Sequence, residues 1–227
     1  MLAGVVDLLL PPRCPACGQP ATAALCVACL AAAGTLALGD HGRAVLAEGV
    51  AAVGAFAYAG VIAAAVRSVK AGGRHAAMRG LGALMWDHLG LPAPARAPWA
   101  VTWVPSSRRR LRQRGVELTR LLAGPGAVAL LRRPLERPDQ TTLEVAARRA
   151  SPVGAFAPTG PTPAAVVLVD DVRTTGATAT AAGLALRSGG ARRVLVATLA
   201  VAGADAGAQA RTPGARGPTS EGRPAPA

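Results

Sequence analysis

Aromatic side chains are scarce in this chain. Phe, Trp and Tyr make up 3% of its 227 residues, which is few for a surface that binds single-stranded nucleic acid by stacking its bases on exposed rings. Trp86, Trp99 and Trp103 are the remaining candidates for such a surface. The scarcity counts against a binding mode that depends mainly on base stacking.

Two common nucleotide-binding motifs are absent. The chain has no G-x-x-x-x-G-K-[ST] segment and so lacks the phosphate loop of the P-loop NTPases. No G-x-G-x-x-G segment follows a predicted strand, which excludes the usual dinucleotide fingerprint. A phosphate-binding loop in this chain must therefore follow another pattern.

Long hydrophobic runs are also missing. A membrane-spanning helix needs about 20 consecutive apolar residues, and no segment reaches that length. Residues 1–10 are apolar but lack the positive start and the cleavage site of a signal peptide, and Pro11 and Pro12 follow at once. We expect a short packing helix there and a cytoplasmic location for the protein.

Acidic residues are few relative to basic ones. The chain has 12 acidic and 25 basic side chains, which gives a net charge of +13. Lys70 is the only lysine, so the other basic side chains are arginines, whose planar fork suits phosphate. This balance predicts anionic partners: phosphorylated metabolites, nucleic acid or anionic lipid.

The four cysteines form two C-x-x-C pairs close together in the sequence: Cys14, Cys17, Cys26 and Cys29. Two such pairs offer four thiolates to one tetrahedral ion, which is the pattern of a structural zinc site. A redox pair is the alternative, but it would not need four cysteines. We expect a zinc-ribbon-like module that has a structural role or serves as a docking surface.

The remaining pattern predicts alternating strands and helices. Strands are expected at residues 51–59, 100–104, 127–131, 166–169 and 194–201. Helices are expected at residues 74–89, 114–123 and 176–187, and residues 61–70 fit either a strand or a helix. This alternation is typical of an α/β fold with a parallel sheet. We expect a double C-x-x-C module at residues 1–38, an α/β domain at 39–201 and a disordered tail at 202–227.

A polar segment follows the buried strand predicted at residues 166–169. Two adjacent carboxylates, Asp170 and Asp171, suit the vicinal hydroxyls of a ribose because carboxylates accept hydrogen bonds. A Thr/Gly-rich turn and a helix start come next, and together they can hold a phosphate. The residues expected to do so are Arg173, Thr174, Thr175, Gly176 and Thr178. The simpler interpretation is that Thr174 or Thr175 only caps the helix and that the acids form a solvated strand end.

Two further segments are expected near the same ligand. Residues 104–115 follow a predicted strand and contain five arginines. About two of these can face a diphosphate, which a bidentate arginine fork matches. Residues 132–156 are long for a connection and fit a lid that excludes water from a reactive ribose cation.

The segment at residues 166–178 resembles the thirteen-residue signature with which type I phosphoribosyltransferases bind phosphoribosyl diphosphate (PRPP). In that family the paired acids hold the ribose 2- and 3-hydroxyls, and the T-T-G-x-T loop holds the 5-phosphate. The resemblance implies a type I phosphoribosyltransferase fold, Mg²⁺ bound with PRPP, and catalytic roles for Asp170 and Asp171. It also implies that the 5-phosphate loop comprises Arg173, Thr174, Thr175, Gly176, Ala177 and Thr178.

The wider pattern is similar to the ComF family of competence proteins. The shared features are the C-x-x-C pairs, Lys70, the V-P-x-S-x-x-R-x-x-x-R-G segment at residues 104–115 and the P-x-Q-T-x-L…G-A-F segment at residues 138–156. The resemblance implies a diphosphate loop made by Ser106, Ser107, Arg110 and Arg114. The chain departs from the usual R-G-F-N-Q, because Val116, Glu117 and Leu118 follow Gly115, and Ser151 replaces a usual asparagine.

Two functions are compatible with these features. The first is a transferase that moves phosphoribosyl from PRPP to a nitrogen nucleophile. The second, which ComF resemblance implies, is a factor in DNA uptake during natural transformation, either as an adaptor on single-stranded DNA or as a PRPP-sensing regulator. In that second function a helicase or a channel protein would be the partner, and the cysteine module would be its docking surface.

Overall fold

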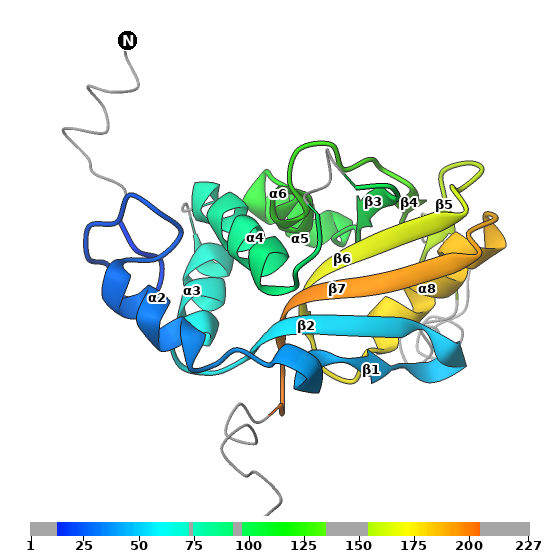
Figure 1. Ribbon diagram of the computed structural model, residues 1–227. Helices are drawn as coiled ribbons and strands as arrows, with labels where there is room; N and C mark the ends of the chain where they lie inside the picture. The colour runs from blue at the N-terminus through cyan, green and yellow to red at the C-terminus, as the bar shows by residue number, and fades with distance from the viewer. Residues whose placement is uncertain (1–12, 73–74, 93–96, 135–153, 205–227) are drawn as a thin grey trace, which may run out of the picture.

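The computed structural model describes residues 13–72, 75–92, 97–134 and 154–204. Its centre is a five-stranded sheet in the order β1-β2-β7-β6-β3 (Figure 1). The strands are β1 (Ala44–Val45), β2 (Ala51–Ala57), β3 (Ala100–Trp103), β6 (Ala165–Arg173) and β7 (Arg193–Val201). Four of them run parallel, and only the short edge strand β1 is antiparallel. The predicted α/β fold with a mostly parallel sheet is confirmed.

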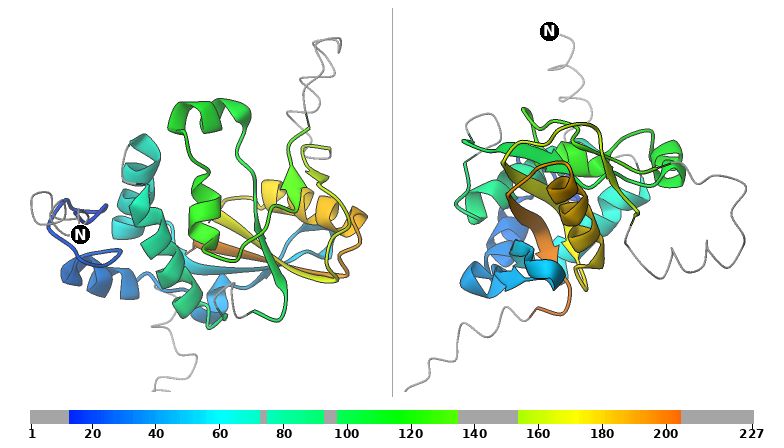
Figure 2. Two further views of the ribbon diagram at one scale, coloured as in Figure 1. Left: turned by 90° about the horizontal axis from the view of Figure 1, so that it is seen from above. Right: turned by 90° about the vertical axis from the view of Figure 1, so that its right-hand side faces the viewer.

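Helices cover both faces of the sheet, and the alternation of side chains along β6 shows why. Val167 and Val169 belong to a hydrophobic cluster with α3 (Gly60–Ala71), α4 (Ala76–His88) and α6 (Leu118–Ala123). Val166 and Leu168 point to the other face and pack with α8 (Ala177–Ser188). Figure 2 shows α8 on one side of the sheet. Because successive strand residues face opposite ways, an apolar run is required here instead of an apolar/polar alternation.

The cysteine-containing segment packs on the helical layer. Its helix α2 (Val27–Gly34) lies against α3, and Leu25 and Ala33 join the same hydrophobic cluster as Met78 of α4. At Gly80 of α4 a Cβ atom would lie 2.8 Å from the Cβ of Ala24, so only glycine allows this close approach. The described part of the predicted module, residues 13–38, thus shares a hydrophobic core with the α/β domain.

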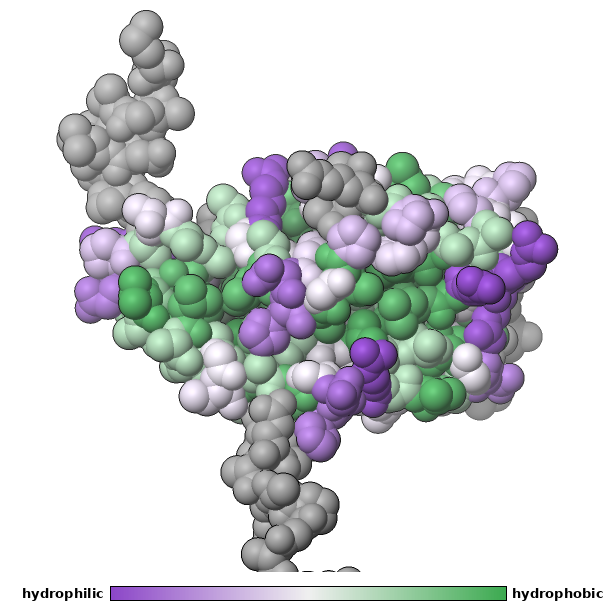
Figure 3. Space-filling view, viewed as in Figure 1, coloured by the Kyte–Doolittle hydropathy of each residue, from purple (hydrophilic) through white to green (hydrophobic). Residues whose placement is uncertain are grey.

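The remaining elements are short: η1 (Gly39–Gly42), η2 (Ala47–Gly49), α5 (Arg108–Arg114), β4 (Leu131–Arg132) and β5 (Ala157–Pro158). Strands β4 and β5 form a separate antiparallel pair. No residue of α5 is buried, and the helix projects from the body of the molecule in Figure 2. In the view of Figure 3, hydrophobic residues extend across the face turned to the viewer, and hydrophilic residues gather toward the end near β5 and α8. The hydrophobic content of 51% is thus visible at the surface as well as in the core.

Most predicted elements are confirmed. Residues 61–70, which fitted either a strand or a helix, are helical as part of α3. Two predictions differ from the structure. The strand predicted at residues 127–131 is wrong, since only Leu131 belongs to a strand, although the Val128 N–H donates a hydrogen bond to the Val101 carbonyl. The helix predicted at residues 114–123 is two helices, because Gly115 ends α5 in the left-handed conformation with φ of 69°.

Some predictions fall on residues outside the described ranges. These are the helix at residues 1–10, most of the lid segment (residues 135–153, including Ser151) and residues 205–227 of the tail. No helix among the described residues is long and apolar enough to cross a membrane.

Candidate ligand site and cysteine cluster

The paired acids lie inside a strand, which corrects the prediction that they begin a loop. Strand β6 continues through Arg173, because its ladder with β7 extends to the pairs Asp170↔Thr198 and Arg173↔Val201. The connection to α8 is therefore short, residues 174–176. The backbone ladder holds both carboxylates at the carboxyl end of the parallel strands, where α/β sheets bind ligands.

Gly176 shapes the turn between β6 and α8. It is the N-cap of α8 with a φ of 82°, and a Cβ atom there would lie 2.9 Å from Leu46 Cδ2. No side chain caps this helix, and Thr175 Oγ1 only accepts a 3.4 Å hydrogen bond from the Ala177 N–H. The simple interpretation of a threonine N-cap is therefore wrong. The exposed Thr174 and Thr178 flank a helix start whose first N–H groups have no intrahelical acceptor.

Asp171 forms an ion pair that the sequence did not predict. Its Oδ2 lies 2.6 Å from Lys70 Nζ, and the two side chains are only 15% and 31% exposed. Lys70 stands in the last turn of α3, so the pair connects the helical layer to the end of β6. The feature of the sequence that singles out Lys70 is that it is the only lysine of the chain.

The Asp170 carboxyl gains or loses its proton near neutral pH. Burial raises the pKa of Asp170 to about 7, and the negative charge of Asp171 acts in the same direction. A hydrogen bond from the Asp171 N–H to Asp170 Oδ1 (2.9 Å) and the positive charges of Lys70 and Arg133 oppose the rise. The two adjacent carboxylates thus differ: one is paired with a lysine, and the other exchanges its proton near pH 7.

Stability is expected to depend on pH through Asp170. The ordinary pKa of this group is 3.8 and the native one is about 7, so between these values the native state keeps a proton that the unfolded chain has lost. The free energy of unfolding should therefore fall as pH rises from about 5 to about 7.5. Urea unfolding across this range should show a flatter profile for Asp170→Asn. An equal slope in both proteins would contradict the assignment.

Arg133 is a second neighbour that the sequence did not place in the site. Its Nε donates a 2.8 Å hydrogen bond to the Pro105 carbonyl, and its guanidinium carbon lies 4.4 Å from the centre of the Phe156 ring. Burial lowers the pKa of Arg133, with Arg110 acting in the same direction, while the charges of Asp170 and Glu117 raise it. Arg133 thus places a positive charge between the end of β3 and the end of β6.

The predicted diphosphate residues extend from the turn before α5 to the last residue of that helix. Ser107 is the N-cap of that helix, and its Oγ accepts a 3.4 Å hydrogen bond from the Arg110 N–H. Arg110 is exposed and Arg114 is half-buried. Ser106 is bound to the Glu117 carboxylate through both its N–H and its hydroxyl. The structure brings Ser106 into contact with one of the residues by which the chain departs from the ComF pattern.

Arg173 turns toward the β1 hairpin. Its Nη2 donates a 3.0 Å hydrogen bond to the Gly42 carbonyl. Its Nε is buried, and no described residue accepts a hydrogen bond from it. Burial lowers the pKa of the Arg173 guanidinium. The guanidinium of Arg173 is thus already engaged by the fold through the Gly42 carbonyl.

The four cysteines converge on one point. Their sulfur atoms all lie within 4.8 Å of one another, and Cys17 Sγ is 3.6 Å from Cys26 Sγ. Sulfur atoms around a tetrahedral zinc ion are about 3.8 Å apart, since each Zn–S bond is about 2.3 Å. Cys14 and Cys29 are buried and the other two reach the surface. The cluster can therefore hold a metal ion such as zinc.

Backbone hydrogen bonds favour the thiolate form of Cys14, whereas burial raises the pKa of the Cys29 thiol. Burial alone would raise the pKa of Cys14, but hydrogen bonds from the backbone of Cys26, Cys17 and Ala16 lower it to about 6. The turn itself is closed by a 2.9 Å hydrogen bond from the Gly18 N–H to the Cys14 carbonyl. A thiolate is the form of cysteine that binds metal.

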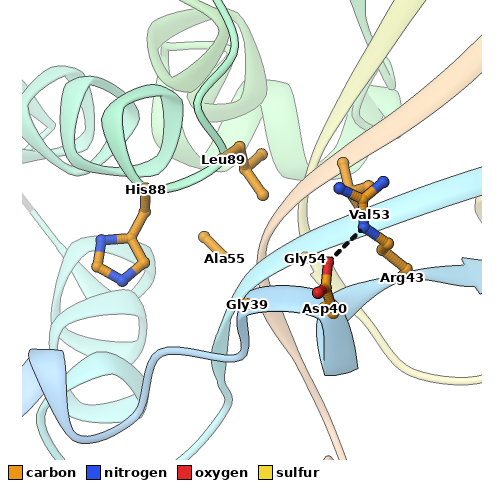
Figure 4. Close-up of a pocket in the computed structure, with 8 residues that line it drawn as sticks. All are labelled: Gly39, Asp40, Arg43, Val53, Gly54, Ala55, His88 and Leu89. Atoms are coloured by element: carbon orange, nitrogen blue, oxygen red, sulfur yellow. Dashed lines mark hydrogen bonds and ion pairs between the residues drawn. The ribbon is translucent and has the colours of Figure 1, made fainter.

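A separate cavity of about 230 Å³ lies between η1, β2 and the end of α4. Figure 4 shows its lining, with the exposed Asp40–Arg43 ion pair (2.9 Å) at one side and His88 at the other. None of the residues predicted for the ribose, phosphate or metal sites lines it. The cavity is therefore separate from the predicted ligand site.

Comparison of the chain with models of known protein families, and with curated proteins, finds no match.

Proposed function

We propose that this chain binds PRPP at the carboxyl ends of β6 and β3, as a phosphoribosyltransferase-like protein of the ComF type. One observation carries the proposal: two adjacent carboxylates lie near the carboxyl end of the parallel strand β6, and a helix N-terminus follows after a three-residue turn closed by Gly176. This is the order of groups that a ribose 5-phosphate requires, hydroxyl acceptors first and phosphate donors next.

Each half of the turn has its own role in the proposal. Asp170 and Asp171 accept hydrogen bonds from the ribose hydroxyls. The backbone N–H groups of Ala177 and Thr178, with the hydroxyls of Thr174 and Thr175, bind the 5-phosphate, and Arg173 supplies positive charge nearby. Gly176 supports this role because its left-handed φ and the contact with Leu46 leave no room for a side chain.

Mg²⁺ fits the donor set at the end of β6. Carboxylate oxygens are ligands that Mg²⁺ prefers, usually together with phosphate oxygens of the substrate. Asp170 has no ion-pair partner among the described residues, whereas Asp171 is paired with Lys70, so Asp170 is the more available ligand. When bound, Mg²⁺ would neutralise the diphosphate and assist its departure.

The reaction in this proposal is phosphoribosyl transfer to a nitrogen nucleophile. The chain's own contribution is positioning and charge stabilisation. In this reaction the acids would orient the ribose, and the positive charge of Arg133 would stabilise the departing diphosphate. Asp170, with its pKa of about 7, can accept or release a proton at neutral pH. The predicted motifs contain no histidine that could do so instead.

A second candidate function rests on helix α5. Its arginines are not buried, and the helix has no acidic residue in its first turn, so it offers a phosphate backbone a row of positive charge. This favours an adaptor in DNA uptake that binds single-stranded DNA, with the cysteine module available to a helicase or channel protein. Trp103 is a weak stacking platform for bases, since Arg120 already lies 5.7 Å from its ring centre.

Two assays on the purified chain separate the functions. Release of diphosphate from PRPP and Mg²⁺ with an amine acceptor, abolished by Asp170→Asn, is expected for the transferase. Salt-dependent binding of a single-stranded oligonucleotide, unchanged by Asp170→Asn and weakened by Arg108→Gln with Arg109→Gln, is expected for the adaptor. PRPP binding without diphosphate release would favour the PRPP-sensing regulator.

A further inference from the structure

Glu117 occupies the donors of the predicted diphosphate loop. The Ser106 N–H lies 2.9 Å from Glu117 Oε2, and the Ser106 Oγ lies 2.5 Å from Oε1. The carboxylate therefore binds Ser106 with both oxygens, as an anionic ligand would. Both donors that Ser106 could offer to a diphosphate are already used.

The contact is built into the fold. Glu117 is half-buried and is the N-cap of α6, and the Thr119 hydroxyl lies 3.0 Å from its Oε1. The same hydroxyl donates to the Val104 carbonyl at 2.8 Å, which ties this group to the end of β3. A carboxylate held by both donors of Ser106 is more than a mobile surface charge, and releasing it would leave these two donors without their acceptor.

Charge adds to the effect of the hydrogen bonds. A diphosphate at Ser106 would stand beside the negative charge of Glu117, and like charges at such a distance repel. The nearby positive charge of Arg133 is already acted on by Glu117 and Asp170. The ribose-phosphate half of the site, at residues 170–178, has no such internal anion at the start of α8, where the first turn carries no acidic residue.

We propose that Glu117 is a specificity-determining residue that takes the place of the diphosphate, so that the chain recognises the ribose 5-phosphate moiety and gains little affinity from the diphosphate of PRPP. This inference rests on the proposed function, since it concerns the other half of the same site. The ligand class it implies is ribose 5-phosphate and its esters, of which PRPP is one member.

The test compares three probes in the presence of Mg²⁺: ribose 5-phosphate, PRPP and inorganic diphosphate. The wild-type chain is expected to bind the first two within about threefold of each other and to bind diphosphate weakly. Glu117→Gln keeps the shape of the side chain but removes its charge, and it should raise the preference for PRPP over ribose 5-phosphate by about tenfold or more. It should also strengthen binding of inorganic diphosphate.

Glu48→Gln is the matched control, because Glu48 is exposed on the β1–β2 hairpin and makes the same change of charge. The ratio of its affinities for PRPP and ribose 5-phosphate should equal that of the wild type, and thermal unfolding should show that both variants are folded. A wild-type preference for PRPP that is already large and is unchanged in Glu117→Gln would overturn the inference while leaving the proposed function intact. Absence of binding by all proteins to both sugar phosphates would overturn the two together.

Discussion

Replacing both Asp170 and Asp171 with asparagine is expected to weaken binding of PRPP with Mg²⁺ by at least about a hundredfold. A hydrogen bond to a charged group contributes about 1.5–3 kcal/mol, and every 1.4 kcal/mol is about tenfold in affinity. Two such bonds to the ribose hydroxyls therefore account for the loss. Asparagine keeps the size of each side chain, so the strand pairing Asp170↔Thr198 should persist.

The measurement is a binding titration at about pH 8, where Asp170 is mostly ionised because its pKa is about 7. Asp40→Asn is the matched control, since Asp40 is 91% exposed and pairs with Arg43 outside the site. Thermal unfolding of each variant shows whether it is folded. Equal affinity of the double variant and the wild type would contradict the roles given to the two acids.

Removing the metal from the cysteine cluster is expected to have the second large effect. The purified chain should contain about one equivalent of zinc, because four sulfurs within 4.8 Å of one another are arranged to bind one ion. Zinc binding to such sites in small domains is worth about 10 kcal/mol or more, and a part of this should appear in folding. Since Cys14 and Cys29 belong to the main hydrophobic cluster, the loss should reach α3 and α4.

Cys29→Ser tests this directly, with Val27→Ser as the control, because Val27 is in the same helix but is 87% exposed. The Cys29 variant should lose zinc and should lower the free energy of unfolding in urea by about 3 kcal/mol or more. A chelator should have the same effect on the wild type and none on the Cys29 variant. A zinc content far below one equivalent in the untreated wild type would contradict the metal assignment.

The sequence was most informative where local pattern decides structure. Apolar runs predicted the buried strands β6 and β7, and the C-x-x-C spacing predicted the convergence of the four cysteines. Gly115 was the local signal that the helix predicted at residues 114–123 would break. The end of β6 was predicted too early, because two carboxylates are unusual inside a strand and only pairing with β7 extends it through Arg173.

The contacts that tune the site could not be predicted from the sequence. Lys70 meets Asp171, and Arg133 meets Pro105, only because α3, β3 and β6 are brought together by the sheet order. The bond between Ser106 and Glu117 depends on the turn at Gly115 between α5 and α6. Lys70, Arg133 and Glu117 are all polar, yet nothing in the sequence next to each of them indicates its contact.

Whether the end of β6 binds a ribose phosphate can be decided by calorimetric titration of the wild-type chain with PRPP and Mg²⁺. We expect one site per chain with a dissociation constant in the micromolar range, corresponding to about 8 kcal/mol, and loss of that binding when Asp170 and Asp171 are both replaced. Absence of binding by the wild type at about 1 mM PRPP, equivalent to about 4 kcal/mol, would show that the end of β6 is not a PRPP site.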